Sequence, residues 1–144
     1  MFERAGDVVA AARACIGTPF RHQGRVPGLG LDCAGLGIVA AKAVGIEIKD
    51  FSGYPRLPFD GMLKKMFDEQ INLKRVEKND ASPGDVLLMR IEQAPQHVAI
   101  LSYGGYMIHA YQGVGKVVEQ RIDKLWSNKI VAVYRFVLSE AAHE

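Results

Sequence analysis

The chain has 144 residues, of which 49% are hydrophobic and 24% are charged, and its formal net charge is +2. This length suits one domain with a substantial core, and the small charge with dispersed Lys and Arg does not favour nucleic-acid binding. No apolar run approaches the roughly 20 residues of a membrane span, and the carboxylates of Glu3 and Asp7 are not typical of an export signal.

Helical spacing of apolar residues predicts three helices in the first half of the chain. They cover residues 2–16, 32–44 and 59–71, and glycines at positions 17 and 45 end the first two. Residues 20–31 are polar and rich in glycine, which predicts a loop between the first two helices, and residues 46–58 read as an irregular connection.

Short apolar runs separated by glycine-rich turns predict strands in the second half. They cover residues 73–76, 86–89, 96–103, 106–111, 116–122 and 130–138, with a turn at 82–85 and a helical turn at 123–126. Helices followed by strands predict an α+β fold, with N-terminal helices packed on a C-terminal antiparallel sheet of about five to six strands. Without repeats or linkers, we expect a single domain over residues 1–138 and a flexible tail over 139–144.

Cys33 is the candidate nucleophile. Asp32 is a good helix cap because its carboxylate accepts a backbone N–H, which places Cys33 in the first helical turn. There the helix dipole favours negative charge, so we expect a lowered thiol pKa. A buried core thiol is the alternative, and it is the reading we favour for Cys15.

Two strand histidines are the candidate partners of Cys33. His97 opens one predicted strand and His109 lies in the next, so His97 can take the thiol proton while His109 holds the other ring nitrogen of His97. Both rings share a face only if the intervening turn has an odd length, such as Tyr103 to Gly105, which places His109 opposite Ala99. Pairing of His109 with Ile100 would separate the rings.

Metal binding is the less favoured reading of the same three side chains. Zinc motifs have close ligand pairs, which Cys33, His97 and His109 lack. Two cysteines are also too few for a disulfide scaffold. We therefore expect free thiols and neither a metal nor a cofactor.

Five segments, in this order, resemble the NlpC family of papain-like cell-wall peptidases. They are Gly17-Thr18-Pro19-Phe20-Arg21, Leu31-Asp32-Cys33-Ala34-Gly35-Leu36, Pro83-Gly84-Asp85-Val86, His97-Val98-Ala99-Ile100 and Ile108-His109-Ala110. The resemblance implies a papain-like fold with Cys33 as nucleophile, His97 as base and His109 as third member. It also implies hydrolysis of peptidoglycan stem peptides, commonly between D-glutamate and the diamino acid.

The chain departs from the family pattern beside the nucleophile. Phe20 stands where the family usually has tyrosine and Ala34 where it prefers serine, so Phe20 offers no hydroxyl. His22 and Gln23 are nearby candidates for substrate binding. Asp32 could bind the amino end of a stem, although helix capping explains it equally well.

The Thr18-Pro19-Phe20-Arg21-His22-Gln23-Gly24 loop, the short length and the lack of an export signal look like phage-tail or gene-transfer-particle members of the family. This implies synthesis in the cytoplasm and action at the cell wall or periplasm as part of a virion-like particle, with other particle proteins as partners. The alternative is a non-catalytic tail-assembly module that keeps the fold.

Overall fold

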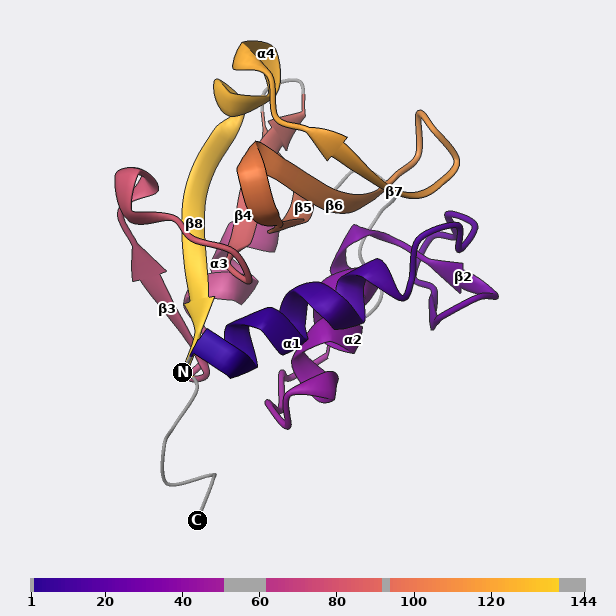
Figure 1. Ribbon diagram of the computed structural model, residues 1–144, viewed down its shortest axis with the longest axis horizontal. Helices are drawn as coiled ribbons and strands as arrows, with labels where there is room; N and C mark the ends of the chain where they lie inside the picture. Colours follow the sequence, from indigo (N-terminus) through magenta and orange to yellow (C-terminus); the bar gives the residue numbers. More distant parts are fainter. Residues whose placement is uncertain (1, 51–61, 92–93, 138–144) are drawn as a thin grey trace.

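A six-stranded antiparallel sheet organises the computed structural model, which describes residues 2–50, 62–91 and 94–137 (Figure 1). The sheet order is β3-β8-β4-β5-β6-β7, and β1 and β2 form a separate hairpin. The strands are β1 Arg25–Val26, β2 Gly30–Leu31, β3 Leu73–Val76, β4 Val86–Ile91, β5 Ala94–Leu101, β6 Tyr106–Tyr111, β7 Lys116–Arg121 and β8 Ile130–Phe136. The α-helices are α1 Phe2–Arg13, α2 Cys33–Ala43, α3 Met62–Asp68 and α4 Lys124–Ser127.

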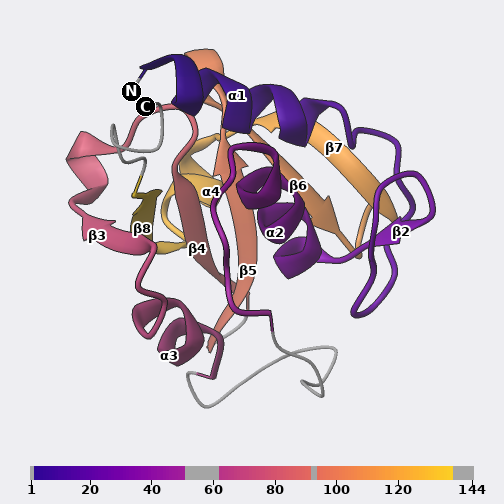
Figure 2. The same cartoon turned by 90° about the horizontal axis from the view of Figure 1, so that it is seen from below.

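Helices α1 and α2 lie against one face of the sheet (Figure 2). Helix α2 has apolar residues nearly all round, and Ala40 and Ala41 are fully buried in the main core. Small side chains on this helix permit close packing against α1 and the strands. The predicted α+β architecture is therefore confirmed, with the helices on the sheet as expected.

A second, smaller core lies on the other face of the sheet. Strand β4 shows the division, because Val86 and Leu88 join the main core while Leu87 and Met89 join the smaller one. Trp126 of α4 packs against this smaller core. Alternating apolar side chains thus fill both faces of the central strands.

The turn between β5 and β6 has three residues, Tyr103–Gly105, with positive φ at Gly104 and Gly105. Ile100 pairs with Ile108 and Leu101 with Met107, and this register, extended by one residue beyond the last pair, sets Ala99 against His109. The predicted odd-length turn is confirmed. It places the side chains of His97 and His109 on the same face of the sheet, that of the smaller core.

Local boundaries differ from the predictions in the first half of the chain. Helix α1 ends at Arg13 instead of residue 16, because tighter backbone bonds follow and Gly17, at φ 93°, donates its N–H to the carbonyl of Val117. The predicted loop at 20–31 contains the β1–β2 hairpin. Strands β3 and β6 have the predicted bounds, whereas the start of the third helix at Phe59 and the tail at 139–144 lie outside the described residues.

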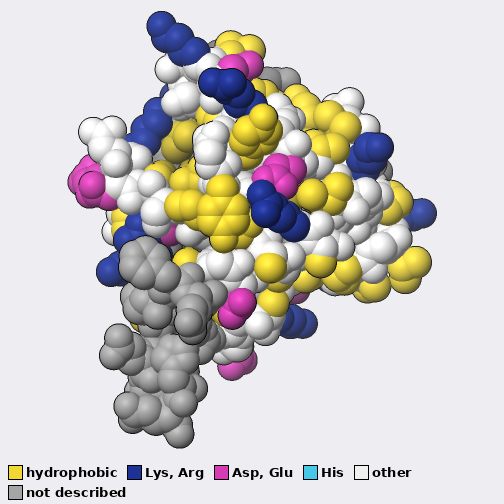
Figure 3. Space-filling view, in the orientation of Figure 1, with side chains coloured by type: hydrophobic (Ala, Val, Ile, Leu, Met, Phe, Trp, Pro, Cys, Tyr) yellow, Lys and Arg dark blue, Asp and Glu magenta, His cyan; other side chains and the backbone are white. Residues whose placement is uncertain are grey.

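No helix in the described ranges has the length and apolar character needed to cross a membrane. On the face seen in Figure 3, the Lys and Arg side chains are scattered among acidic and hydrophobic ones and do not form one patch.

Candidate active site

The start of helix α2 is fixed by Asp32, which is 3% exposed. Its Oδ1 accepts the backbone N–H of Gly35 at 2.8 Å, as predicted for a helix cap. Cys33 follows as the first residue of α2 and is partly exposed. The cap thus sets the position of the thiol.

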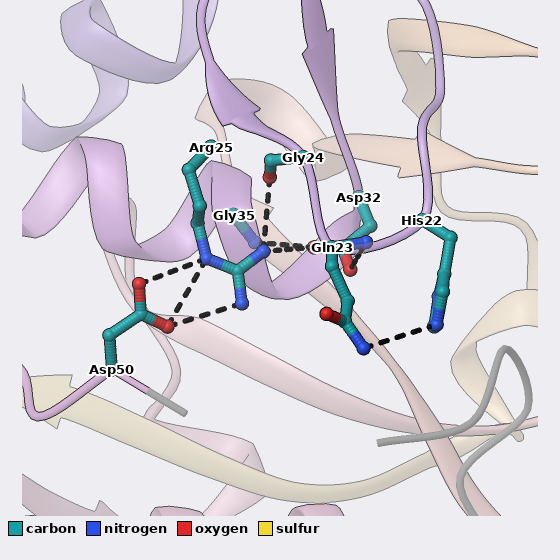
Figure 4. Close-up of polar contacts among 7 residues, drawn as sticks. All are labelled: His22, Gln23, Gly24, Arg25, Asp32, Gly35 and Asp50. Carbon is teal, nitrogen blue, oxygen red and sulfur yellow. Dashed lines mark hydrogen bonds and ion pairs between the residues drawn. The ribbon is translucent and has the colours of Figure 1, made fainter. Parts of the chain in front are cut away.

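The loop before α2 is tied to the same carboxylate (Figure 4). Asp32 Oδ2 accepts the backbone N–H of Gln23 at 2.8 Å, and Arg25 Nη1 contacts Oδ1 at 3.0 Å. Arg25 also binds Asp50, with Nε 3.1 Å from Oδ2. These contacts join the loop, the helix start and the chain after α2, so they provide a structural role for Asp32.

Gly35 allows the loop to approach the helix closely, and Gly24 allows the loop to fold closely on itself. A Cβ at Gly35 would overlap the carbonyl oxygen of Gly24, and a Cβ at Gly24 would lie 2.5 Å from the carbonyl oxygen of Gly30. Side chains at these positions would push the loop away from the cap. The loop therefore keeps its close contact with the start of α2 only with glycine at positions 24 and 35.

The sulfur of Cys33 lies where strands β5 and β6 separate. In the described residues their ladder runs only from Leu101 to Ile100 on β5, although β5 continues past His97. Leu101 donates its N–H to the carbonyl of Asp85, on the β4 side of the strand. Because N–H groups alternate in direction along an antiparallel strand, the N–H of Val98, three residues earlier, points to the opposite side, toward β6. That N–H hydrogen-bonds to the Cys33 thiol, which places the sulfur one residue from His97 along β5.

The two strand histidines are in direct contact, as predicted. His97 Nε2 and His109 Nδ1 are 2.7 Å apart, and His109 Nε2 lies 2.7 Å from Gln120 Oε1. His97 is 4% exposed and His109 is fully buried. The three side chains form a continuous chain of hydrogen bonds across β5, β6 and β7.

Aromatic rings enclose the histidine pair. The ring centroid of Tyr111 is 5.5 Å from those of both histidines, and that of Trp126 is 5.3 Å from His109 and 6.1 Å from His97. Burial, with a smaller effect of nearby His109, lowers the pKa of His97 from 6.5 to about 3. Burial also lowers the pKa of His109, against the opposing effect of its bond to Gln120. Both imidazoles are therefore neutral near pH 7.

The expected lowering of the thiol pKa is wrong. Burial first, and then the negative charge of Asp32, raise the pKa of Cys33 from 9.0 to about 12. Hydrogen bonds from the N–H groups of Val98, Ala34 and Cys33 itself lower the thiol pKa, as expected, but their effect is smaller than that of burial and Asp32. The resting site therefore pairs a neutral thiol with neutral imidazoles.

The remaining predicted binding residues lie in the loop before α2. Gln23 and His22 face each other, with their Nε2 atoms 3.4 Å apart (Figure 4). Phe20 is half-buried against the main core, and its N–H donates to the carbonyl of Gly115 in the turn between β6 and β7. Gln23 is thus brought to Asp32, beside Cys33, whereas Phe20 contributes mainly to packing.

Gln120, Arg25, Tyr111 and Trp126 were not predicted from the sequence as site residues. Gln120 has a usable signal: in a strand paired with β6, it is the diagonal neighbour of His109 on the same face. The contacts of Arg25 and Trp126 depend on loop and turn conformations that no periodic pattern reveals. Within the described ranges no group of three or more His, Cys, Asp or Glu could hold a metal ion.

The site has a cysteine at the start of a helix, hydrogen-bonded to the strand that carries one of two paired histidines, and its helices pack against an antiparallel sheet. This arrangement is typical of the papain-like α+β class. The sequence profile of the NlpC/P60 family matches residues 17–135, and the chain belongs to this family. No curated protein matches the sequence.

Solved structures share the fold at low sequence identity. The P60 domain of an antigen from M. avium subspecies paratuberculosis has 19% identity and a TM-score of 0.67, over 96% of this chain and 97% of that one. The peptidoglycan hydrolase RipB from Mycobacterium tuberculosis has 20% identity and a TM-score of 0.68, over 96% of this chain and 66% of that one. NlpC1 from Trichomonas vaginalis has 17% identity and a TM-score of 0.69, over 92% of this chain and 44% of that one.

Proposed function

We propose that this chain is a cysteine endopeptidase that hydrolyses the peptide stems of bacterial peptidoglycan. The observation that carries the proposal is the meeting of the Cys33 thiol with the β5 backbone beside His97, whose ring is held by His109 at 2.7 Å. Membership of the NlpC/P60 family and the fold shared with the peptidoglycan hydrolase RipB support this substrate class.

His97 is the base that activates the thiol. Its Nε2 is engaged by His109, so Nδ1, on the backbone side of the ring, takes the proton of Cys33 as the sulfur attacks a stem carbonyl. Because the thiol and imidazole are both neutral at rest, proton transfer accompanies attack. The imidazolium then protonates the departing amine, and water, deprotonated by His97, hydrolyses the thioester.

The developing oxyanion lies at the start of α2. The backbone N–H of Cys33 is one donor, since helix N-termini favour negative charge. The loop that carries Phe20, His22 and Gln23 borders this position and contacts the stem. Asp32 contributes by holding that loop, and could also receive the amino end of a stem. The scissile bond is the one between D-glutamate and the diamino acid, on the family resemblance.

We further propose that the chain works in a phage-tail or gene-transfer particle that delivers it to the cell wall, where the particle's other proteins are its partners. The support is the resemblance of the Thr18–Gly24 loop to such members of the family. Mass spectrometry of purified particles from a producing strain tests this role. Particles that lack the chain would contradict it.

Replacement of Cys33 by alanine tests the activity. We expect Cys33→Ala to fold normally and to lose muropeptide cleavage by about a thousandfold or more, because no other group supplies the nucleophile. Mass spectrometry of products from a defined muropeptide measures cleavage and identifies the bond. The matched control is Cys15→Ala, which changes a buried thiol in the main core and should retain activity.

Retained cleavage in Cys33→Ala would exclude this nucleophile. If the unmodified protein cleaves no muropeptide, the chain is a non-catalytic module that keeps the fold.

A further inference from the structure

Gln120 ends the hydrogen-bond chain of the histidines on strand β7. Its Oε1 lies 2.7 Å from His109 Nε2, and it is partly buried. It contacts His109 from the diagonal position on the neighbouring strand, and His109 in turn contacts His97.

We propose that Gln120 is a positioning residue that sets the tautomers of both histidines, so that His97 presents an unprotonated Nδ1 to Cys33. The proposal deepens the proposed peptidase function and rests on it for its catalytic consequence. The tautomers themselves are a property of the folded chain and can be measured without substrate.

The amide oxygen of Gln120 determines which nitrogen is protonated, first in His109 and then in His97. An amide oxygen can only accept, so His109 Nε2 carries its proton and donates to Gln120. Neutral His109 then has its lone pair at Nδ1, which accepts from His97 Nε2 at 2.7 Å. Neutral His97 has its remaining lone pair at Nδ1, the nitrogen that receives the thiol proton.

The reverse order disables the base. If the amide nitrogen faced His109, each donor and acceptor would exchange, and His97 would carry a proton at Nδ1. The two rings are buried against Tyr111 and Trp126, which limits water as an alternative partner. The orientation of one amide is therefore transmitted across two rings to the site of attack.

A neutral amide is also suited to this place. A carboxylate at position 120 would favour the charged imidazolium and stabilise it before substrate binds. Gln120 instead supplies an acceptor without a net charge, so both histidines remain neutral until the thiol proton is transferred.

Nitrogen-15 NMR of the full chain, labelled at histidine, measures the tautomers directly. At pH 8 we expect protons on Nε2 of both His97 and His109, with the signals assigned through His97→Gln and His109→Gln. In Gln120→Met, which keeps the length but removes the acceptor, we expect a mixture of tautomers at both rings.

The matched control is Gln70→Met, the same chemical change at a glutamine that bonds to the backbone of Lys49 away from the site. It should leave both tautomers unchanged. In muropeptide cleavage we expect Gln120→Met to lower kcat about tenfold to a hundredfold, the range for loss of an orienting partner, with KM little changed.

A proton on Nδ1 of His97 in the unmodified protein would overturn the proposal, whether or not Gln120→Met folds. So would Gln120→Met that retains single Nε2-protonated tautomers. Absence of muropeptide cleavage with the expected tautomers would contradict the proposed function but leave the assignment of Gln120 intact.

Discussion

At Cys33, position in the helix and burial act in opposite directions. The first turn of α2 offers backbone N–H groups to the sulfur, and this alone would favour a thiolate. Burial and the neighbouring Asp32 carboxylate outweigh that effect and raise the pKa of the thiol to about 12. In the proposed mechanism the thiol is therefore activated by transfer of its proton to His97 during attack, and not by a standing negative charge.

The raised pKa predicts how Cys33 reacts with iodoacetamide. Because only the thiolate reacts, the alkylation rate should rise about tenfold per pH unit below the pKa. We expect a continuous rise between pH 6 and pH 9, measured by mass spectrometry of the modified peptide. Cys33→Ala reports the reaction of buried Cys15 by itself. A rate that levels off below pH 7 would instead indicate a preformed thiolate.

Among the structural elements, the contact between α2 and the loop before it depends on Gly35. A methyl group there would overlap the carbonyl oxygen of Gly24 and crowd Arg25 and Asp32. Gly37, one half-turn later on the same helix, has room: a methyl group would lie 3.9 Å from Val98 Cγ1, an ordinary contact.

This difference predicts opposite effects of the same substitution. Gly35→Ala should lower the free energy of unfolding by about 1–3 kcal/mol, because the backbone must shift to relieve the overlap. Gly37→Ala should leave it unchanged or raise it by up to about 1 kcal/mol, since alanine favours the helix. Urea denaturation followed by circular dichroism measures both. Equal effects at the two positions would show that the close approach to Gly24 has no energetic importance.

The elements that carry a clear period could be predicted from the sequence. Strands β3 and β6 have their predicted bounds, and the turn length required to bring His97 and His109 together is observed at Tyr103–Gly105. The β1–β2 hairpin was missed because strands of two residues are too short to show alternation. The end of α1 was misplaced because the bond from Gly17 to Val117 is a tertiary contact.

The candidate site was predictable only in part, because some of its properties depend on tertiary contacts. Cys33 was placed by the capping signal of Asp32, and the histidine pair by strand parity. The direction of the Cys33 pKa was mispredicted because the burial of the thiol is set by how α2 packs against β5 and β6, which local sequence does not contain. Arg25 reaches Asp32 and Asp50 through the fold of a glycine-rich loop.

At the scale of the whole molecule, the site joins segments that are distant in sequence. Helix α2 supplies the sulfur, three neighbouring strands supply His97, His109 and Gln120, and α4 supplies the ring of Trp126. A further link ties α1 to β7, where Arg13 pairs with Glu119 at 3.0 Å. Because these segments enclose the histidines only in the folded state, protonation of the histidines is linked to folding.

That linkage predicts loss of stability in mild acid. The pKa of His97 is about 3 in the folded chain and 6.5 ordinarily, so between these values the unfolded chain binds the proton preferentially. The full contribution is present above pH 6.5 and is lost as the pH falls toward 3. The free energy of unfolding should fall by about 2 kcal/mol between pH 7 and pH 5 from this group.

Urea denaturation at each pH, followed by the emission of Trp126, measures this change. His97→Gln removes this group and should make the dependence less steep above pH 5, where most carboxylates remain ionised, while leaving the smaller part that His109 contributes through its own lowered pKa. An equally steep loss in that variant would assign the acid sensitivity to other groups and contradict the burial of a neutral His97.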